Sequence, residues 1–314
     1  MHLPKIVVTA TASTPVRTDV FRSVIAGRAI VQEVDLPFSD GNQDLEPYWQ
    51  QLETAHALFV RTGNIPAPLL RRCHNLQGIV THGAGADQVD VSVAESLGIK
   101  VINLPGANAN AVAELTLGLM LASLRRIPQA DRLLRSSGWE TSRLPGMELG
   151  GKTVGLIGFG QIGRRVAALL QPFNVRLLVT NRSVPAAVGL DYELVSLEEL
   201  LAASDIVSIH VPLTPDTRHM LNKQRLALLK PGVIIVNTAR GAIIEQEALR
   251  KALMSGHLAG AALDVFDPEP PATDDPLLRM DNVILTPHLG GSTQECLVEL
   301  ARRGAAAVIE LLGL

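Results

Sequence analysis

Short apolar runs alternate with helix-forming segments along almost the whole chain. The runs expected as strands in the first part are Ile6–Ala10, Ala29–Val34, Ala57–Val60, Gly78–Thr81 and Val101–Asn103, with helices at Pro66–Cys73 and Ser92–Leu97. A second series predicts strands at Thr153–Ile157, Arg176–Thr180, Ile206–His210, Val233–Asn237, Gly260–Leu263 and Val283–Thr286. Strands that alternate with helices form parallel sheets covered by helices on both faces. The expected fold class is therefore α/β, with two doubly wound parallel-sheet domains.

The first strand of the second series leads into a glycine pattern, Gly158-x-Gly160-x-x-Gly163, which is followed by a helical segment. The first glycine permits a tight turn, the second lets a pyrophosphate approach the backbone, and the third lets helix and strand pack closely. Together with Gln161 and Ile162, these residues would offer backbone N–H groups to the phosphates of a dinucleotide. We therefore predict a dinucleotide-binding Rossmann domain.

The position of the glycine pattern near the middle of the chain predicts an insertion. We expect residues 104–288 to form the Rossmann domain and residues 1–103 with 289–314 to form a substrate-binding domain. A closing helix from about Thr293 to Leu312 would return to that first domain. The segment from Asn110 to about Arg126 is apolar on most of its circumference, which predicts burial between domains or against a second subunit.

The end of the predicted strand Arg176–Thr180 bears on the choice of dinucleotide. Rossmann sites that prefer NAD normally carry Asp or Glu there, bound to the ribose 2′-OH. This chain has Asn181, followed by Arg182 and Ser183, and all three can donate hydrogen bonds to a 2′-phosphate. NADP is therefore the expected cofactor. The alternative is that these residues form a solvated loop and that NAD is used as well.

Composition and charge exclude several function classes. With 314 residues, 47% hydrophobic and 19% charged, the chain can form two domains with ordinary cores. A net charge of −3 gives no general attraction to nucleic acid or to anionic membranes, so neither is an expected partner. The two cysteines have no metal-ligand spacing, and the N-terminus has no signal-peptide pattern. We expect no bound metal and a cytoplasmic location.

Three predicted strands of the second series end in polar residues. Arg240 follows one strand, Asp264 and Glu269 follow another, and His288 follows the last. Each has a simpler reading. Arg240 could form a surface ion pair, Glu269 could be a solvated acid, and His288 could be a satisfied loop histidine. Because parallel sheets bind ligands at the carboxyl edge, the shared placement favours a single site.

Several short segments match a known family in their order along the chain. They are 82–87 (HGAGAD), 103–106 (NLPG), 111–114 (AVAE), 210–217 (HVPLTPDT), 237–241 (NTARG), 263–266 (LDVF) with Glu269-Pro270, and 286–288 (TPH). With the glycine pattern, they resemble the D-isomer-specific 2-hydroxyacid dehydrogenase family over nearly the whole chain. The resemblance implies a flavodoxin-like substrate domain, an inserted Rossmann domain and a homodimer. The helix that begins at Asn110 would form much of the dimer contact.

The same resemblance implies roles for the polar residues. Arg240 would bind the carboxylate and keto oxygen of a 2-keto acid. His288 would donate a proton to the developing alkoxide, and Glu269 would hydrogen-bond its imidazole and fix its tautomer. The other expected contacts are Asp264, Thr238, Ala239, Pro212, Thr217 and Gly290 with the cofactor, and the backbone at Ala84 and Gly85 with the substrate carboxylate.

The expected activity is hydride transfer between NADP(H) and a small 2-keto acid, as in glyoxylate or hydroxypyruvate reductases. Formate dehydrogenases of this superfamily have Gln in the role of Glu269, so the acid favours keto-acid chemistry. Arg61 would either bind a second anionic group of the substrate or pair with a carboxylate at the rim. His82 would line the pocket or cap a strand.

Other functions stay open at this point. One is an NAD-dependent dehydrogenase of a larger or doubly anionic 2-hydroxy acid. Another is a non-catalytic, cofactor-sensing protein like the corepressors that share this fold. A third is oxidation of an inorganic or one-carbon anion such as phosphite. Nothing resembling the regulatory domain of long phosphoglycerate dehydrogenases follows Leu314, so feedback control by serine is not expected.

Overall fold

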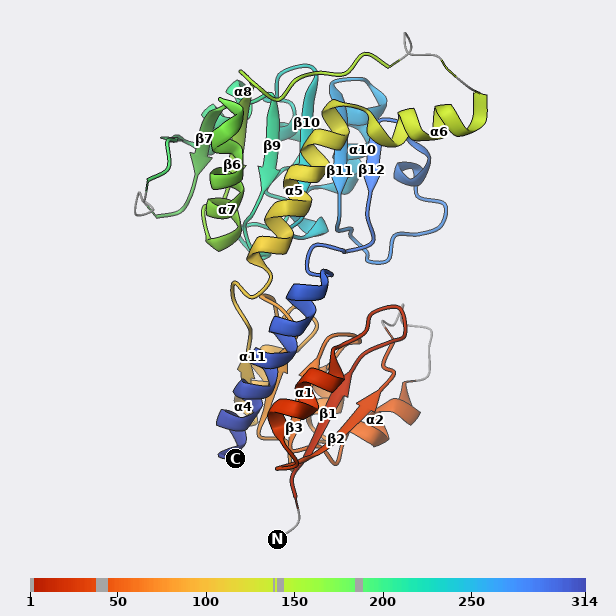
Figure 1. Ribbon diagram of the computed structural model, residues 1–314, viewed down its shortest axis with the longest axis vertical. Coiled ribbons are helices and arrows are strands. Elements are labelled where there is room, and N and C mark those ends of the chain that lie inside the picture. Colours follow the sequence, from red (N-terminus) through yellow and green to blue (C-terminus); the bar gives the residue numbers. More distant parts are fainter. Residues whose placement is uncertain (1–2, 38–44, 138, 140–143, 184–188) are drawn as a thin grey trace. The chain divides into compact units, whose positions relative to one another are not determined.

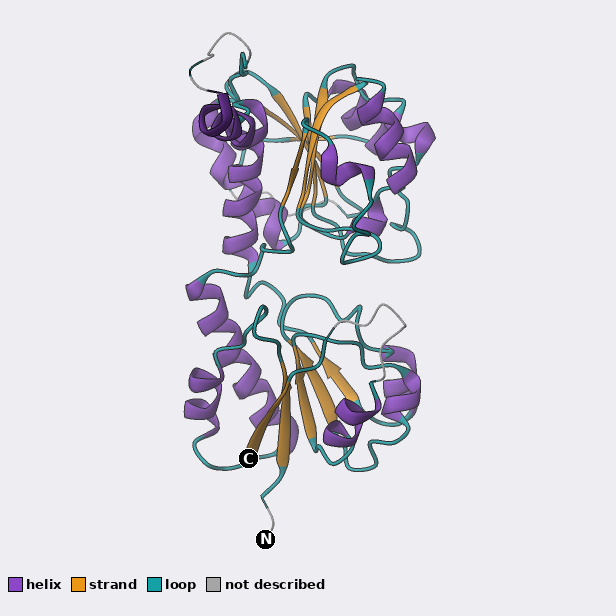
Figure 2. Cartoon of the chain, turned by 90° about the vertical axis from the view of Figure 1, so that its right-hand side faces the viewer, coloured by secondary structure: helices purple, strands orange, loops and turns teal. Residues whose placement is uncertain are grey.

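Two compact α/β units make up the protein. The computed structural model describes residues 3–37, 45–137, 139, 144–183 and 189–314. Unit 1 comprises Met1–Asn108 and Gly291–Leu314, and unit 2 comprises Ala109–Gly290. The sequence analysis places these divisions at 103/104 and 288/289. In each unit, helices cover both faces of the sheet (Figure 2). No helix in the described part of the chain is long and apolar enough to cross a membrane.

Unit 1 is a five-stranded parallel sheet in the order β2-β1-β3-β4-β5. This is the flavodoxin-like order of a doubly wound fold, as predicted. Its elements are β1 (Lys5–Thr9), α1 (Thr18–Ile25), β2 (Ile30–Val34), α2 (Glu46–Leu52), β3 (Ala57–Val60), α3 (Ala67–Leu70), β4 (Gly78–Thr81), α4 (Val91–Ser96), β5 (Lys100–Ile102) and α11 (Gln294–Leu312).

The closing helix α11 belongs to unit 1, where a glycine allows close packing on the sheet. A Cβ atom at Gly304 would lie 2.4 Å from the ring of Phe59 on β3, so only glycine fits there without a shift. The Phe59 ring also stacks on Phe21 of α1, with 5.0 Å between the ring centroids. Helices α1 and α11 therefore share one face of the sheet.

Unit 2 is a seven-stranded parallel sheet in the order β12-β11-β10-β9-β6-β7-β8. This is the Rossmann order, extended by one strand beyond β11. Its elements are α5 (Ala109–Leu124), α6 (Ile127–Ser137), β6 (Thr153–Ile157), α7 (Gln161–Leu170), η2 (Gln171–Phe173), β7 (Arg176–Thr180), β8 (Glu193–Leu194), α8 (Leu197–Ala203), β9 (Ile206–Ile209), α9 (Lys223–Leu226), β10 (Val233–Asn237), η3 (Gly241–Ile243), α10 (Gln246–Met254), β11 (Leu258–Leu263), η4 (Pro276–Arg279) and β12 (Val283–Leu285).

The apolar helix α5 packs within its own unit, where Leu119 and Met120 belong to the core on one face of the sheet. The contact with a second subunit that the sequence analysis expects stays a prediction. Helices α5 and α7 pack together on one face of the sheet of unit 2 (Figure 1), and α8, α9 and α10 cover the other. A sheet of seven strands has a broad apolar face, and α5 is apolar all round because it covers that face and contacts α7 as well.

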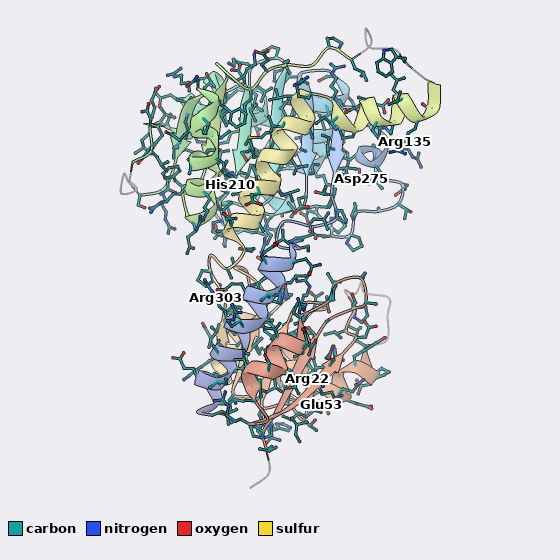
Figure 3. The ribbon with its side chains drawn as sticks, viewed as in Figure 1. Arg22, Glu53, Arg135, His210, Asp275 and Arg303 are labelled. Atoms are coloured by element: carbon teal, nitrogen blue, oxygen red, sulfur yellow. The ribbon has the colours of Figure 1, made fainter. Side chains whose placement is uncertain are left out.

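A neutral histidine supports the glycine turn of unit 2. His210, labelled in Figure 3, follows β9, and its Nε2 lies 2.9 Å from the hydroxyl oxygen of Ser208. A Cβ atom at Gly158 would lie 2.6 Å from the backbone oxygen of His210, so the two segments are in direct contact. Burial lowers the pKa of His210 to about 3. The imidazole is therefore uncharged at neutral pH.

We expect the free energy of unfolding to fall as the pH drops below about 6.5 toward about 3, because the unfolded chain binds a proton at His210 that the folded chain excludes. One such histidine contributes a slope of up to ~1.4 kcal/mol per pH unit in that window. His210→Gln, which keeps a hydrogen-bonding group near Ser208, should reduce the slope, whereas His74→Gln at an exposed histidine should not. Urea unfolding at several pH values measures the slope. Equal slopes in wild type and His210→Gln would contradict this assignment.

Candidate active site

The candidate catalytic residues follow three neighbouring strands of unit 2. Strands β10, β11 and β12 are parallel and adjacent, with Asn237 opposite Leu263 and Leu263 opposite Leu285. Main-chain hydrogen bonds continue past the strand ends, since Asp264 N donates to Asn237 O at 2.9 Å and His288 N donates to Asp264 O at 2.9 Å. The segments that carry Arg240, Glu269 and His288 therefore leave the sheet at one edge.

Glu269 and His288, which the sequence analysis pairs, are in contact. The Nδ1 atom of His288 is hydrogen-bonded to Oε1 of Glu269. The other carboxylate oxygen, Oε2, accepts from the backbone N–H of Phe266 at 3.4 Å. Because Glu269 occupies Nδ1, Nε2 is the ring nitrogen left to exchange a proton with a ligand. Both side chains are partly exposed, so a ligand can reach them.

The backbone around Arg240 is held by hydrogen bonds and by a close contact. Asn237 Nδ2 donates to Arg240 O at 2.9 Å, and Asn237 Oδ1 accepts from Ala239 N at 3.0 Å. The guanidinium Nη1 donates to Ala239 O at 2.7 Å. At Gly241, a Cβ atom would lie 2.0 Å from the carbonyl carbon of Phe266. The arginine loop therefore packs directly on the backbone that leads to Glu269.

The Asp264 side chain binds the segment that carries His288. Its Oδ1 accepts from the Thr286 hydroxyl at 2.6 Å and from Leu289 N at 2.7 Å, and its Oδ2 accepts from Gly290 N at 2.8 Å. The residue is only 1% exposed, and burial raises the pKa of its carboxyl group while these hydrogen bonds oppose the rise. The structure thus brings together Asp264 and Gly290, two of the residues expected to contact the cofactor.

Two threonine hydroxyls that support the site were not singled out from the sequence. One is Thr286, just described. The other is Thr116 of α5, whose Oγ1 lies 2.9 Å from Oγ1 of Thr238 and donates to Val112 O at 2.7 Å. Thr116 lies within an apolar helix and Thr286 precedes a proline. Thr286 belongs to the motif 286–288 and Thr116 lies two residues after the motif 111–114, but neither motif indicates a role for the hydroxyl.

The glycine turn after β6 has the shape that dinucleotide phosphates require. Gly158 has φ +97°, which favours glycine, and a Cβ atom at Gly163 would lie 2.3 Å from Gly158 O. By contrast, nothing lies within 4 Å of a Cβ atom built at Gly160. Gly160 also begins α7 without a capping side chain, so the first backbone N–H groups of the helix, from Gln161 and Ile162, have no side-chain acceptor there. These residues fit the phosphates of NAD or NADP.

Asn181 links the glycine turn to the loop after β7. Its Oδ1 accepts from Phe159 N at 3.2 Å, and its Nδ2 donates to Ser183 O at 2.8 Å. Arg182 and Ser183 are exposed beside it. The sequence analysis expected this amide at the ribose end of the site, and its position next to the turn suits that expectation.

The segment after β9 forms a turn of its own. The hydroxyl of Thr217 donates to Pro212 O at 2.7 Å and accepts from Thr214 N at 2.7 Å. Pro212 and Thr217, both expected to contact the cofactor, are therefore brought together.

In unit 1, Arg61 and His82 follow the adjacent strands β3 and β4 and contact each other. Arg61 Nη1 lies 2.9 Å from His82 Nδ1, and Nη2 lies 3.4 Å from the hydroxyl of Ser292. Burial and, next, the charge of Arg61 lower the pKa of His82 to about 3. In the loop that follows β4, Ala84 O accepts from Asn103 Nδ2 at 3.0 Å, and Gly85 is partly buried.

A Rossmann sheet with an open glycine turn and a histidine–carboxylate pair at its carboxyl edge is typical of nicotinamide-dependent dehydrogenases. Residues 117–290 match the family described as D-isomer specific 2-hydroxyacid dehydrogenase, NAD binding domain. The chain belongs to this family, which confirms the resemblance inferred from its motifs.

Individual relatives differ in their named substrates. The chain is 42% identical to a hydroxypyruvate reductase of Thermotoga maritima over 274 residues, which cover 86% of this chain and 89% of that protein. It is 41% identical to a D-3-phosphoglycerate dehydrogenase of Methanocaldococcus jannaschii over 268 residues, covering 84% of this chain but only 50% of that protein. Among solved structures, the NAD-dependent formate dehydrogenase of Staphylococcus aureus in complex with NAD is 29% identical, with a TM-score of 0.87 over 98% of this chain and 95% of that one.

A pair of glycine variants tests the fit of the turn to a dinucleotide. Gly160→Ala should leave the thermal midpoint unchanged, because its Cβ enters open space, but weaken NADPH binding at least ~10-fold, because the methyl group occupies the approach of the pyrophosphate. Gly163→Ala should lower both the thermal midpoint and the affinity for NADPH, because its Cβ meets Gly158 O. Fluorescence titration of NADPH and thermal unfolding measure the two effects. Unchanged NADPH affinity in Gly160→Ala would show that phosphates do not bind here.

Proposed function

We propose that the protein is a cytoplasmic homodimer that reduces small 2-keto acids of the glyoxylate and hydroxypyruvate type, with NADPH preferred to NADH. The observation that carries the proposal is the His288–Glu269 hydrogen bond at the same sheet edge as Arg240. A proton donor held by a carboxylate is what the reduction of a ketone to an alcohol requires. The 42% identity to a hydroxypyruvate reductase supports this substrate class.

The proposed reaction gives a distinct task to each of the three candidate catalytic residues, Arg240, His288 and Glu269. Bound nicotinamide supplies the hydride. The planar guanidinium of Arg240 binds the substrate carboxylate and polarises the keto group, together with backbone N–H groups at Ala84 and Gly85. His288 gives the proton on Nε2 to the oxygen that develops negative charge. Glu269 keeps the ring oriented by binding Nδ1.

The cofactor assignment rests on the residues around the glycine turn. The phosphates would bind Gly158, Gly160, Gln161, Ile162 and Gly163, and the nicotinamide end would lie near Thr238, Ala239, Asp264 and Gly290, with Pro212 and Thr217 between them. The preference for NADPH is inferred from Asn181, Arg182 and Ser183, which present no carboxylate to repel a 2′-phosphate. An Arg–phosphate contact contributes roughly 1.5–3 kcal/mol.

Exposed apolar side chains support the homodimer. Leu134 on α6 is 56% exposed and Trp139, just beyond α6, is 83% exposed. Leu117 and Leu121 of α5 are only partly buried. Large apolar side chains left exposed close together in sequence are typical of interfaces. The cytoplasmic location is inferred from Cys73 and Cys296, which are both free.

A second substrate class, a 2-keto acid with a further anionic group, is favoured by Arg61. This guanidinium is largely buried, which lowers its pKa, and within the described residues its contacts are His82 and Ser292 rather than a carboxylate. A buried cation of this kind is an attractive site for an anion. The identity to a phosphoglycerate dehydrogenase points the same way.

Rates of NADPH oxidation with glyoxylate, hydroxypyruvate and a dicarboxylic or phosphorylated 2-keto acid test the reaction and its substrate. His288→Ala should lower kcat about 10²–10⁴-fold. Arg61→Gln should raise KM for the doubly anionic acid and leave KM for glyoxylate unchanged. NADPH binding without turnover of any acid would instead favour a cofactor-sensing protein.

Exchange of the residues beside the ribose tests the cofactor preference. Asn181→Asp keeps an acceptor for Phe159 N but brings a negative charge, and Arg182→Gln removes a positive one. Each should lower the ratio of kcat/KM for NADPH to that for NADH by about 10- to 100-fold. Arg71→Gln, at an exposed arginine of unit 1, should not change it. A wild type that already prefers NADH would refute this part of the proposal.

A further inference from the structure

His288 lies in a backbone conformation that its own residue type does not favour. Its φ is +54°, in the left-handed region, where residues other than glycine are uncommon. Such a conformation persists only where the surroundings hold it, and it is found preferentially at functional positions. The Glu269 hydrogen bond holds the ring of His288, and the backbone N–H of His288 donates to Asp264 O at 2.9 Å. The residues on either side of His288 need contacts of their own to keep the segment in place.

The Asp264 side chain supplies these flanking contacts. It accepts three hydrogen bonds from the segment, one from the Thr286 hydroxyl before His288 and two from the backbone N–H groups of Leu289 and Gly290 after it. These contacts bracket His288 on both sides. Since Gly290 has no side chain, its backbone can come close to the carboxylate, and a Cβ there would lie 3.2 Å from Oδ2.

The charge of Asp264 also depends on this segment. The carboxylate is 1% exposed, and its hydrogen-bond partners are the three donors just named. An ionised carboxylate out of water is stable only if such donors surround it. Removing the Thr286 hydroxyl or the negative charge would therefore release the loop, because each side of the contact stabilises the other.

We propose that Asp264 and Thr286 are positioning residues for His288, which hold its backbone in the left-handed conformation and so aim Nε2 at the substrate. This rests on the proposed function for its catalytic consequence. It differs from a role of Asp264 in binding the nicotinamide, which the sequence analysis expected. A carboxylate has about four acceptor positions, and three are taken by the loop, so one remains for a ligand.

The two roles predict different results in a double-mutant cycle of Asp264→Asn and His288→Ala. If Asp264 acts through His288, Asp264→Asn should lower kcat about 100-fold in the wild-type background, as a small displacement of a catalytic group does. In the His288→Ala background it should change the residual rate less than ~3-fold. Additive losses of rate in the two backgrounds would overturn the proposal.

A second pair of variants leaves every charge in place. Thr286→Val removes the hydroxyl at nearly constant shape, and Thr286→Ser retains it. Thr286→Val should lower kcat, as Asp264→Asn does, whereas Thr286→Ser should keep most of the wild-type kcat. Equal rates in the Val and Ser variants would overturn the proposal, provided that thermal unfolding shows both to be folded.

Hydrogen exchange gives a readout that does not need turnover. Loss of the support should speed amide exchange in residues 286–290 of Asp264→Asn and Thr286→Val, with exchange in β6 and α7 unchanged. Exchange at the wild-type rate would overturn the positioning role. A different result is that the wild type reduces no 2-keto acid while the two variants still show faster exchange in residues 286–290. That result would refute the proposed function but not the support of the His288 segment by Asp264 and Thr286.

Discussion

The parallel register of β10, β11 and β12 is the constraint on which the site depends. Because the three strands end at the same level, the loops that follow them start side by side, and main-chain hydrogen bonds from Asp264 to Asn237 and from His288 to Asp264 extend the ladder into the loops. Gly241 then lets the arginine loop rest on the backbone of Phe266. The candidate catalytic side chains are thus placed by sheet geometry, and each loop needs only a few contacts of its own.

Three histidines, His82, His210 and His288, differ in whether their surroundings allow them to act as proton donors. Burial keeps His210 neutral beneath the glycine turn, and burial together with Arg61 keeps His82 neutral in unit 1. Neither can serve as a proton donor near neutral pH. His288 is the most exposed of the three and has a carboxylate on Nδ1. Residue type alone does not distinguish them, whereas solvent access and the nearest charge do.

Sequence patterns predicted the buried part of the fold well and the exposed part less well. The run from Val233 to Val236 is β-branched and covered on both faces, and strand β10 has the predicted bounds Val233–Asn237. Strand β8 and helix α6 were missed, because Glu193–Leu194 is too short and exposed to show a pattern and α6 has few buried residues. In the site, motifs identified Glu269 and His288. The Asp264–Thr286 contact was not predictable, because it depends on side-chain directions in a loop with a left-handed residue.

The strand order of unit 2 also sets how far a cofactor held at the glycine turn must reach along the sheet edge. From β6, where the glycine turn lies, to β11, which leads to Asp264, the sheet crosses β9 and β10. Neighbouring strands are about 4.8 Å apart, so the two points are separated by roughly 14 Å. Asn181 follows β7, which lies on the other side of β6 from β9. A dinucleotide with its phosphates at α7 would therefore extend both ways along the sheet edge, one nucleotide toward Asn181 and the other across this distance toward the loop of Asp264.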